Sequence, residues 1–332
     1  MPTGLIPPLL AGLVDDAALV SRGGTVPLDD AALLDAASAH REHAAAWYAE
    51  LVGPLLISMS VLARARLSGA ERASGTERPS RAESLSGSER ALGGPERASG
   101  LERVAGPAWP FGAERPEIAV IADTGLDAFV RARSRIDRRF TVRQVEVPVA
   151  KRGEDPQPGL HRLIRALASG AAPRGYAEIP LSWGLLGALD TVAAARAAGA
   201  PVAAKFRTGG LAAELFPTPV ELAAIICACR ERDLPFKLTA GPHHALRSAD
   251  PETGFVHHGF LNVLVASVLA ADGGEVADVA EVLASTDPVR LIEAVRARRE
   301  EPRPLWEGFG ATAVIDPLTD LIRFGLVNGG FD

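Results

Sequence analysis

The feature that most constrains the fold is a regular alternation of short apolar runs and alanine-rich segments over residues 117–240. The runs are rich in β-branched residues and predict strands, whereas the segments between them have the composition of helices. Strands are expected at 117–122, 142–147, 176–181, 201–207 and 235–240, and helices near 126–135, 159–168, 185–198 and 219–232. Their spacing is that of successive strand–helix units, which build a parallel sheet covered by helices.

Local signals support these helix boundaries. Thr218, Pro219 and Glu221 form a capping-box pattern, in which a cap residue precedes a proline at the first helical position and a glutamate two positions later. Gly199 and Gly325 lie where helix C-caps belong, because glycine adopts the left-handed conformation at no steric cost.

The rest of the chain extends this pattern toward eight strands. Residues 29–51 predict a helix that leads to a first strand near 55–59, and residues 308–315 predict a late strand followed by a final helix. Residues 260–266 fit either an eighth strand or a buried helix. The favoured fold is therefore an α/β (βα)8 TIM-type barrel, complete or slightly irregular. The alternative is an open doubly wound sheet, although no glycine-rich dinucleotide motif follows an early strand.

A low-complexity segment interrupts the chain before these units. Over residues 66–106, Glu-Arg pairs recur between Ser, Gly, Ala and Pro. The segment lacks the apolar content that offsets the entropy of ordering, so we expect a disordered insertion. The sequence thus divides into an N-terminal helical segment with the first barrel strand (1–65), a Ser/Gly/Glu/Arg insertion (66–116) and the remainder of the barrel (117–332).

Composition excludes several classes of protein. The chain has 35 basic and 41 acidic residues and a formal net charge of −6, which argues against a nucleic-acid binder. The longest uncharged apolar runs are shorter than the roughly 20 residues of a membrane span, and no signal-peptide pattern opens the chain. The two cysteines, Cys227 and Cys229, cannot form a disulfide framework or a zinc-finger spacing. We expect a cytoplasmic protein without membrane or nucleic-acid partners, and the oligomeric state stays open.

Lysine is scarce: three of the 35 basic residues are lysines and the others are arginines. Codon bias in a GC-rich genome explains the trend, but the two residue types differ chemically. A lysine amine can lose its proton and act as a nucleophile, whereas an arginine stays charged. Lys151 lies in a polar loop, but Lys205 and Lys237 fall at equivalent positions on two consecutive predicted strands. These two lysines are therefore the central candidates for chemistry.

The first candidate cluster lies at the end of the predicted strand at 201–207. Lys205 and Arg207 are two residues apart, so they share a face, and barrels carry their reactive groups at strand ends. Two cations at the barrel mouth attract a carboxylate or a phosphate, and the arginine favours the neutral form of the lysine. Thr208, Gly209 and Gly210 offer backbone N–H groups to the same anion. The alternative is an ion pair at a strand end followed by flexible glycines.

The second candidate cluster repeats this arrangement on the next strand. Lys237 is followed two residues later by Thr239 and then by Gly241, and His243 and His244 lie on the loop. We expect Lys237 and the two histidines to act in catalysis, and Thr239 and Gly241 to bind the substrate. The alternative is a surface lysine followed by polar loop histidines.

Further polar candidates lie on other segments. His257, His258 and Asn262 are expected to bind substrate, with His258 and Asn262 four residues apart on one helix face; a helix cap region is the alternative. Glu178 lies inside an otherwise apolar strand, where an unpaired charge is costly, and a lysine across the barrel is its expected partner. We expect Glu178 to move protons in catalysis. Asp123, at the end of an earlier strand, is a second acidic candidate.

The two lysine clusters resemble class I aldolases of the deoxyribose-phosphate type. Those enzymes place lysines on neighbouring late barrel strands and follow one of them with a Thr/Ser-Gly turn. The resemblance covers Lys205 and residues 237–241. It implies a lyase in which a lysine forms a Schiff base with a carbonyl substrate.

We therefore expect an enzyme of the aldolase or decarboxylase type that acts on a small anionic carbonyl metabolite and needs no cofactor and no metal. One alternative is a metal-dependent hydrolase or isomerase, in which the histidine cluster holds the ion. Another is a non-catalytic barrel that binds a small anion. The sequence leaves open which of the two lysines is the nucleophile.

Overall fold

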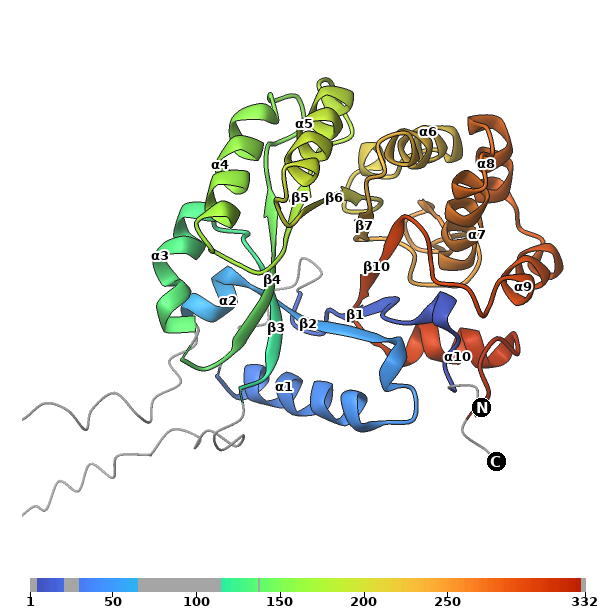
Figure 1. Cartoon of the computed structure of the whole chain (residues 1–332). Coiled ribbons are helices and arrows are strands. Elements are labelled where there is room, and N and C mark those ends of the chain that lie inside the picture. The colour runs from blue at the N-terminus through green and yellow to red at the C-terminus, as the bar shows by residue number, and fades with distance from the viewer. Residues whose placement is uncertain (1–4, 21–29, 65–114, 137, 330–332) are drawn as a thin grey trace, which may run out of the picture.

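The computed structural model describes residues 5–20, 30–64, 115–136 and 138–329. Eight parallel strands close into a barrel surrounded by helices, which confirms the predicted (βα)8 fold (Figure 1). In sheet order the strands run β1-β10-β7-β6-β5-β4-β3-β2 and back to β1. Their bounds are Val14–Asp16 (β1), Val52–Ser58 (β2), Glu117–Ile121 (β3), Thr141–Pro148 (β4), Gly175–Glu178 (β5), Val202–Arg207 (β6), Phe236–Thr239 (β7) and Trp306–Ala311 (β10).

The helices form the outer layer, and four of them gather beside β7 and β10, where α6 packs on α7 and α8, and α7 on α9 (Figure 1). The predicted capping box is confirmed at the start of α6, because Thr218 accepts from the N–H of Glu221 and Glu221 accepts from that of Thr218. The bounds are Asp30–Ala45 (α1), Met59–Arg64 (α2), Leu126–Ile136 (α3), Gln157–Ala168 (α4), Leu185–Ala197 (α5), Pro219–Arg230 (α6), Phe260–Ala271 (α7), Val276–Ala284 (α8), Pro288–Ala297 (α9) and Ile315–Arg323 (α10).

Two expectations about the strands are corrected. The strand expected first, at 55–59, is the second, because the three-residue β1 precedes it. The ambiguous segment at 260–266 belongs to helix α7, which is buried on nearly all sides. An apolar sequence with no polar face has no helical period, so periodicity alone does not separate it from a buried strand. A two-stranded antiparallel pair, Ser248–Ala249 (β8) and Val256–His257 (β9), lies outside the barrel.

The last barrel strand begins and ends earlier than predicted, at Trp306–Ala311 instead of 308–315. Its register against β7 shifts between Trp306 and Gly308, and Gly308 has a φ of 137° that glycine tolerates. Helix α10 then starts at Ile315. The apolar residues at the end of the predicted strand therefore belong to a turn and to this helix.

Phe206 and Phe236 are fully buried with their rings 6.0 Å apart and belong to the large core of the protein. They face the helices, because Lys205 and Lys237 beside them point into the barrel. The barrel interior is uneven. Ala17, Leu56 and Ala119, from the region of β1, β2 and β3, form a small separate apolar cluster. Long charged side chains from β4 to β7 fill the opposite side. Small residues on one side and charged residues on the other set the shape of the site.

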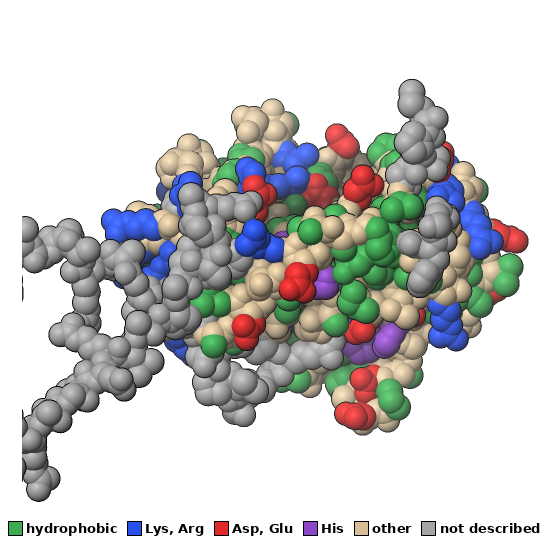
Figure 2. All heavy atoms as spheres, turned by 90° about the horizontal axis from the view of Figure 1, so that it is seen from below, with side chains coloured by type: hydrophobic (Ala, Val, Ile, Leu, Met, Phe, Trp, Pro, Cys, Tyr) green, Lys and Arg blue, Asp and Glu red, His purple; other side chains and the backbone are tan. Residues whose placement is uncertain are grey.

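On the face shown in Figure 2, acidic and basic side chains are interspersed with apolar ones. In the part of the chain that the structure describes, no helix is long and apolar enough to cross a bilayer. The predicted insertion at 66–116 lies outside the described residues, apart from its last two positions.

Candidate functional site

Six charged side chains from five strands form one continuous ion-pair network inside the barrel. The strands alternate their side chains between the barrel interior and the helices, so residues two apart on one strand both point inward. Positive and negative groups alternate along the network. Its members are Asp15 on β1, Glu146 on β4, Glu178 on β5, Lys205 and Arg207 on β6, and Lys237 on β7.

Lys205 lies between two carboxylates. Its Nζ is 2.7 Å from Oε2 of Glu146 and 3.0 Å from Oε2 of Glu178, and the residue is 2% exposed. Burial lowers the pKa of Lys205, but the attraction of Glu146 and Glu178 outweighs it, so this pKa lies above its ordinary value. Glu178 was expected to find a lysine across the barrel, and its partner is instead on the neighbouring strand. The amine of Lys205 is held as an ammonium ion.

Lys237 occupies a different environment, although it pairs in register with Lys205. Its Nζ donates a hydrogen bond to Oδ2 of Asp15 and lies 3.6 Å from Oε1 of Glu146. The same nitrogen lies 4.7 Å from the ring centroid of Tyr176, within the range of a cation–π contact. One carboxylate at hydrogen-bond distance, a second one farther away and an aromatic ring therefore surround this amine.

The pKa of the Asp15 carboxyl group is raised toward neutral pH. Burial raises the pKa of Asp15, Lys237 lowers it and Glu146 raises it again, and the result is about 6. Asp15 also lies so close to β2 that a Cβ at Gly53 would overlap its Oδ1. Gly53 therefore leaves the space in which this carboxyl group sits.

The other two carboxylates of the network stay ionised. Burial raises the pKa of Glu146 and of Glu178, but Lys205 and a second cation lower both, so each pKa lies below its ordinary value. That second cation is Lys237 for Glu146 and Arg207 for Glu178. Arg207 donates two hydrogen bonds, of 3.1 and 3.0 Å, to Oε1 of Glu178, and its side chain is 42% exposed at the carboxyl end of β6.

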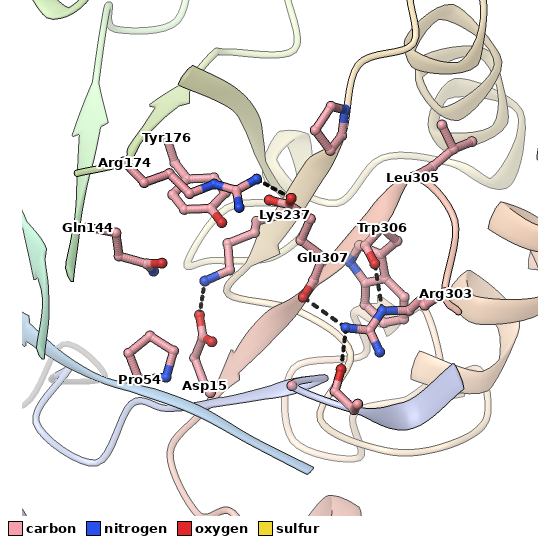
Figure 3. Close-up of a pocket in the computed structure, with 14 residues that line it drawn as sticks. Asp15, Pro54, Gln144, Arg174, Tyr176, Lys237, Arg303, Leu305, Trp306 and Glu307 are labelled. Atoms are coloured by element: carbon pink, nitrogen blue, oxygen red, sulfur yellow. Dashed lines mark hydrogen bonds and ion pairs between the residues drawn. The ribbon is translucent and has the colours of Figure 1, made fainter. Parts of the chain in front are cut away.

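A cavity of about 410 Å³ opens at the amino-terminal ends of the strands and reaches Lys237 (Figure 3). Figure 3 shows Lys237 pointing across it to Asp15, with Arg174 and Tyr176 on one side and Arg303 on another. Its lining residues are Ala11, Gly12, Asp15, Gly53, Pro54, Gln144, Arg174, Tyr176, Pro235, Lys237, Arg303, Leu305, Trp306 and Glu307.

Arg303 closes one edge of this cavity with backbone contacts. Its guanidinium donates to the carbonyl oxygens of Leu9, Ala11, Trp306 and Glu307 at 2.6 to 3.0 Å. Burial lowers the pKa of Arg303 to about 10. The arginine ties the segment before β1 to the start of β10 and forms a fixed wall.

The structure brings together four of the predicted site residues, Lys205, Lys237, Glu178 and Arg207. It corrects their place: only Arg207 reaches the barrel mouth, and both lysines are 3% exposed or less, inside the barrel. The proposed effect of Arg207 on Lys205 is corrected too. Arg207 is neutralised by Glu178, and the carboxylates favour the charged form of Lys205.

The predicted substrate-binding loops after β6 and β7 pack directly on each other. The N–H of Thr208 donates to the carbonyl of Thr239 at 3.0 Å. A Cβ at Gly209 would overlap the carbonyl oxygen of Ala240, and one at Gly241 would overlap Oγ1 of Thr208. These two glycines therefore allow the close approach of the two loops. Gly210 is half-buried, and its Cβ would meet a leucine side chain.

The histidine cluster lies on the long loop between β7 and α7. Nε2 of His258 lies 2.8 Å from the carbonyl of Pro217, and burial lowers the pKa of His258 to about 4. The rings of His243 and His257 are 6.3 Å apart, and His244 is exposed. In the described ranges, no three His, Cys, Asp or Glu side chains are arranged to hold a metal ion.

Asn262 and Asp123 make contacts with backbone. The amide nitrogen of Asn262 donates to the carbonyls of Val282 and Ser285 at 2.9 and 2.8 Å, and its oxygen accepts from the N–H of Arg247 at 3.0 Å. Asp123 accepts from the N–H of Ser60 at 2.9 Å, in the first turn of α2. The role of Asn262 as a substrate ligand and that of Asp123 as an acidic site residue stay predictions.

Sequence reasoning missed Asp15 and Glu146, which complete the network. Glu146 also lies inside a predicted strand, but Arg143 and Gln144 make that strand half polar, so its charge does not stand out as that of Glu178 does. Asp15 follows the apolar run Gly12–Val14 by one position, but β1 is too short to produce a period of two. Tyr176 began a predicted strand without being marked as a site residue.

Comparison with known proteins assigns no family to this chain. No protein-family model matches the chain, and a search of curated proteins finds no match. The (βα)8 barrel is therefore established by the strand order and register, and its chemistry has to be argued from the site itself.

Proposed function

We propose that this barrel is a small-molecule lyase of the aldolase type, in which the amine of Lys237 forms a Schiff base with an anionic carbonyl substrate. One observation carries the proposal: Lys237 borders a cavity and hydrogen-bonds to Asp15, whose pKa of about 6 suits proton transfer near neutral pH. The barrel fold is compatible with an enzyme and by itself names no reaction.

Lys237 is the nucleophile in this proposal, and Lys205 is a positioning residue. Two carboxylates within 3.0 Å hold Lys205 in its ammonium form, which has no lone pair for attack. Lys237 has one close carboxylate partner and lies beside free volume. Through their shared contact with Glu146, Lys205 also keeps that carboxylate ionised and in place next to Lys237.

The chemistry follows from these positions. Lys237 passes a proton to Asp15, and its Nζ then attacks the carbonyl carbon of the substrate. Loss of the carbonyl oxygen as water, with protons returned by Asp15, leaves a protonated iminium. When the substrate carries a β-hydroxyl group, Asp15 accepts the hydroxyl proton, the bond between the α and β carbons breaks, and its electron pair moves into the iminium. An aldehyde leaves, and protonation of the enamine and hydrolysis regenerate the amine.

Borohydride trapping tests this proposal directly. The full chain is incubated with 2-oxobutyrate and with dihydroxyacetone phosphate, reduced with sodium borohydride, digested and mapped by mass spectrometry. We expect one stable adduct, on the peptide that contains Lys237. An adduct on Lys205 would contradict the assignment of the nucleophile, and no adduct with either compound would contradict Schiff-base chemistry.

A further inference from the structure

The barrel offers a ligand two ends, and they differ in what reaches the lysines. At the carboxyl end, Arg207 lies over Glu178 with two hydrogen bonds, and Glu178 in turn contacts Lys205. The charged groups there are paired with one another. At the amino-terminal end, the cavity extends directly to the side chain of Lys237.

Small residues explain why the amino-terminal half is hollow. Barrel interiors are normally filled by layers of bulky side chains. Here Gly12 and Gly53 line the cavity, and Gly308, which pairs in register with Lys237, places no side chain beside it. The volume of about 410 Å³ lies in the range of small-molecule sites.

Arg174 supplies a cation at the outer edge of this cavity. One of its terminal nitrogens pairs with Oε1 of Glu307, and its side chain is 39% exposed, so part of the guanidinium faces open space. The Arg174 Cζ lies 5.2 Å from the ring centroid of Tyr176, and the Lys237 Nζ lies 4.7 Å from the same centroid. Both cationic centres thus contact one ring, which brings them within reach of one short ligand.

The neighbouring carboxylates select the charge of the ligand. Glu307 and Asp15 both line the cavity, so a dianionic phosphate next to Arg174 would meet two acidic neighbours. A monoanionic carboxylate meets less repulsion and matches the planar fork of Arg174. Carboxylate recognition is therefore favoured over phosphate recognition at this end.

The cavity wall also carries polar groups of Tyr176 and Gln144. Burial and the nearby Glu307 raise the pKa of Tyr176, and these two side chains share a hydrogen bond. The amide of Gln144 can donate to a ligand hydroxyl group or accept from it. A β-hydroxyl group on the substrate is required by the cleavage step proposed above.

We infer that the substrate is a short hydroxylated 2-oxo monocarboxylate that enters the barrel from its amino-terminal end, with its carboxylate on Arg174 and its carbonyl at Lys237. The chemical role of Lys237 in this inference rests on the proposed function; the entry route and the carboxylate site rest on the cavity. Such an entry is opposite to the carboxyl-end location of active sites that is general for these barrels.

Calorimetric titration of the full chain and two arginine variants tests the inference. The probes are 2-oxobutyrate, its 4-hydroxy derivative, butanone and dihydroxyacetone phosphate. Arg174→Gln removes the cation at the amino-terminal end, and Arg207→Gln removes a comparable one at the other end. The two are matched, because each arginine is about 40% exposed and paired with one glutamate. Arg290→Gln, which removes an exposed ion pair with Glu281 on the outer helices, is the surface control.

We expect the wild type to bind the two oxo acids more tightly than butanone or the phosphate. Arg174→Gln should weaken oxo-acid binding about tenfold or more, as expected for the loss of a charged hydrogen bond, and Arg290→Gln should leave it unchanged. A loss confined to Arg207→Gln would overturn the inference, as would unchanged binding in both barrel variants or no binding by the wild type. Thermal melting confirms that each variant is folded.

The two proposals fail separately. If borohydride yields an adduct on Lys237 but only Arg207→Gln weakens binding, the lyase stands and the amino-terminal entry is wrong. If Arg174→Gln alone weakens binding but no adduct forms, the cavity is a carboxylate site and the Schiff-base proposal is wrong.

Discussion

Lys237 on β7 hydrogen-bonds to Asp15 on β1 across the strand that separates them in the barrel. The intervening strand, β10, pairs Gly308 with Lys237 and Gly310 with Asp15. Neither glycine places a side chain beside the lysine or the aspartate, which meet directly although they are 222 positions apart in sequence. This contact joins the first and the seventh strand and creates the acid–base pair of the proposed reaction.

The raised pKa of Asp15 predicts that the rate of Schiff-base formation falls in acidic solution. Burial raises the pKa of Asp15 to about 6, so below this pH the group is protonated and cannot accept the proton of Lys237. The rate of trapping with 2-oxobutyrate should fall by up to about tenfold for each pH unit below 6. Asp15→Asn should be slow at every pH. A flat wild-type profile across this range would contradict the role of Asp15.

The same carboxyl group should shape the stability of the protein. The folded-state pKa of Asp15 lies above its ordinary value of 3.8, so the folded protein binds this proton more tightly than the unfolded chain does. Lowering the pH from 7 to about 4 should therefore raise the free energy of unfolding, by about 2 kcal/mol from this group alone. The pKa values of Glu146 and Glu178 are lowered, so their stabilising contribution is lost as the pH falls further.

His258 opposes this rise, because burial lowers the pKa of His258 to about 4 and the unfolded chain takes up that proton first as the pH falls. The contribution of Asp15 is therefore the difference in the free energy of unfolding between the wild type and Asp15→Asn, measured by urea denaturation at a series of pH values. The wild type should gain about 2 kcal/mol relative to the variant between about pH 7 and 4. A difference that stays constant across this range would show that burial does not raise this pKa.

Gly53→Ala should displace Asp15 without adding or removing a charge. The new Cβ would overlap Oδ1 of Asp15, which the ion pair with Lys237 holds in place. We expect a loss of about 1 to 3 kcal/mol in the free energy of unfolding, together with loss of the borohydride adduct. Gly187→Ala is the matched control, because its Cβ has ordinary space inside helix α5 and should be neutral or stabilising. If Gly53→Ala forms the borohydride adduct as efficiently as the wild type, Asp15 takes no part in the reaction.

Lys205 should stabilise the fold through its coupling to Glu146. Lys205→Met leaves Glu146 and Glu178 buried without their common cation and should cost about 3 to 5 kcal/mol in the free energy of unfolding. The double variant with Glu146→Gln should lose less than the two single variants together, by about 1 to 3 kcal/mol. The exposed pair Arg290 and Glu281 should show a coupling of about 0 to 1 kcal/mol in the same urea experiment. Additive losses at Lys205 and Glu146 would refute this coupling.

Asn262→Leu distinguishes a loop anchor from a substrate ligand. The substitution leaves the carbonyls of Val282 and Ser285 and the N–H of Arg247 without their partner, at about 1 to 3 kcal/mol for each buried group. We expect a large drop in the free energy of unfolding, whereas Asn328→Leu, at the exposed second asparagine, should change little. Unchanged stability with weakened oxo-acid binding would instead support the substrate contact that the sequence predicts.

Much of the barrel was accessible from sequence because its signals are local. The strands β3 to β7 and the helices between them were predicted to within a few residues, since each has an apolar run and clear boundaries. The register that pairs Lys205 with Lys237 also follows from equivalent positions on consecutive parallel strands. The sequence did not identify helix α7, because it lacks a polar face, or strand β1, because it has only three residues.

The sequence by itself determined the fold class, the network members Lys205, Lys237, Glu178 and Arg207, and their gathering on adjacent strands. Only the tertiary structure decided which carboxylate each lysine meets and which end of the barrel is hollow. Both depend on closure of the barrel, which brings β1 near β7 and leaves the glycines of β10 between them. Burial and charge pairing, which set the pKa values of these groups, arise only from that closure.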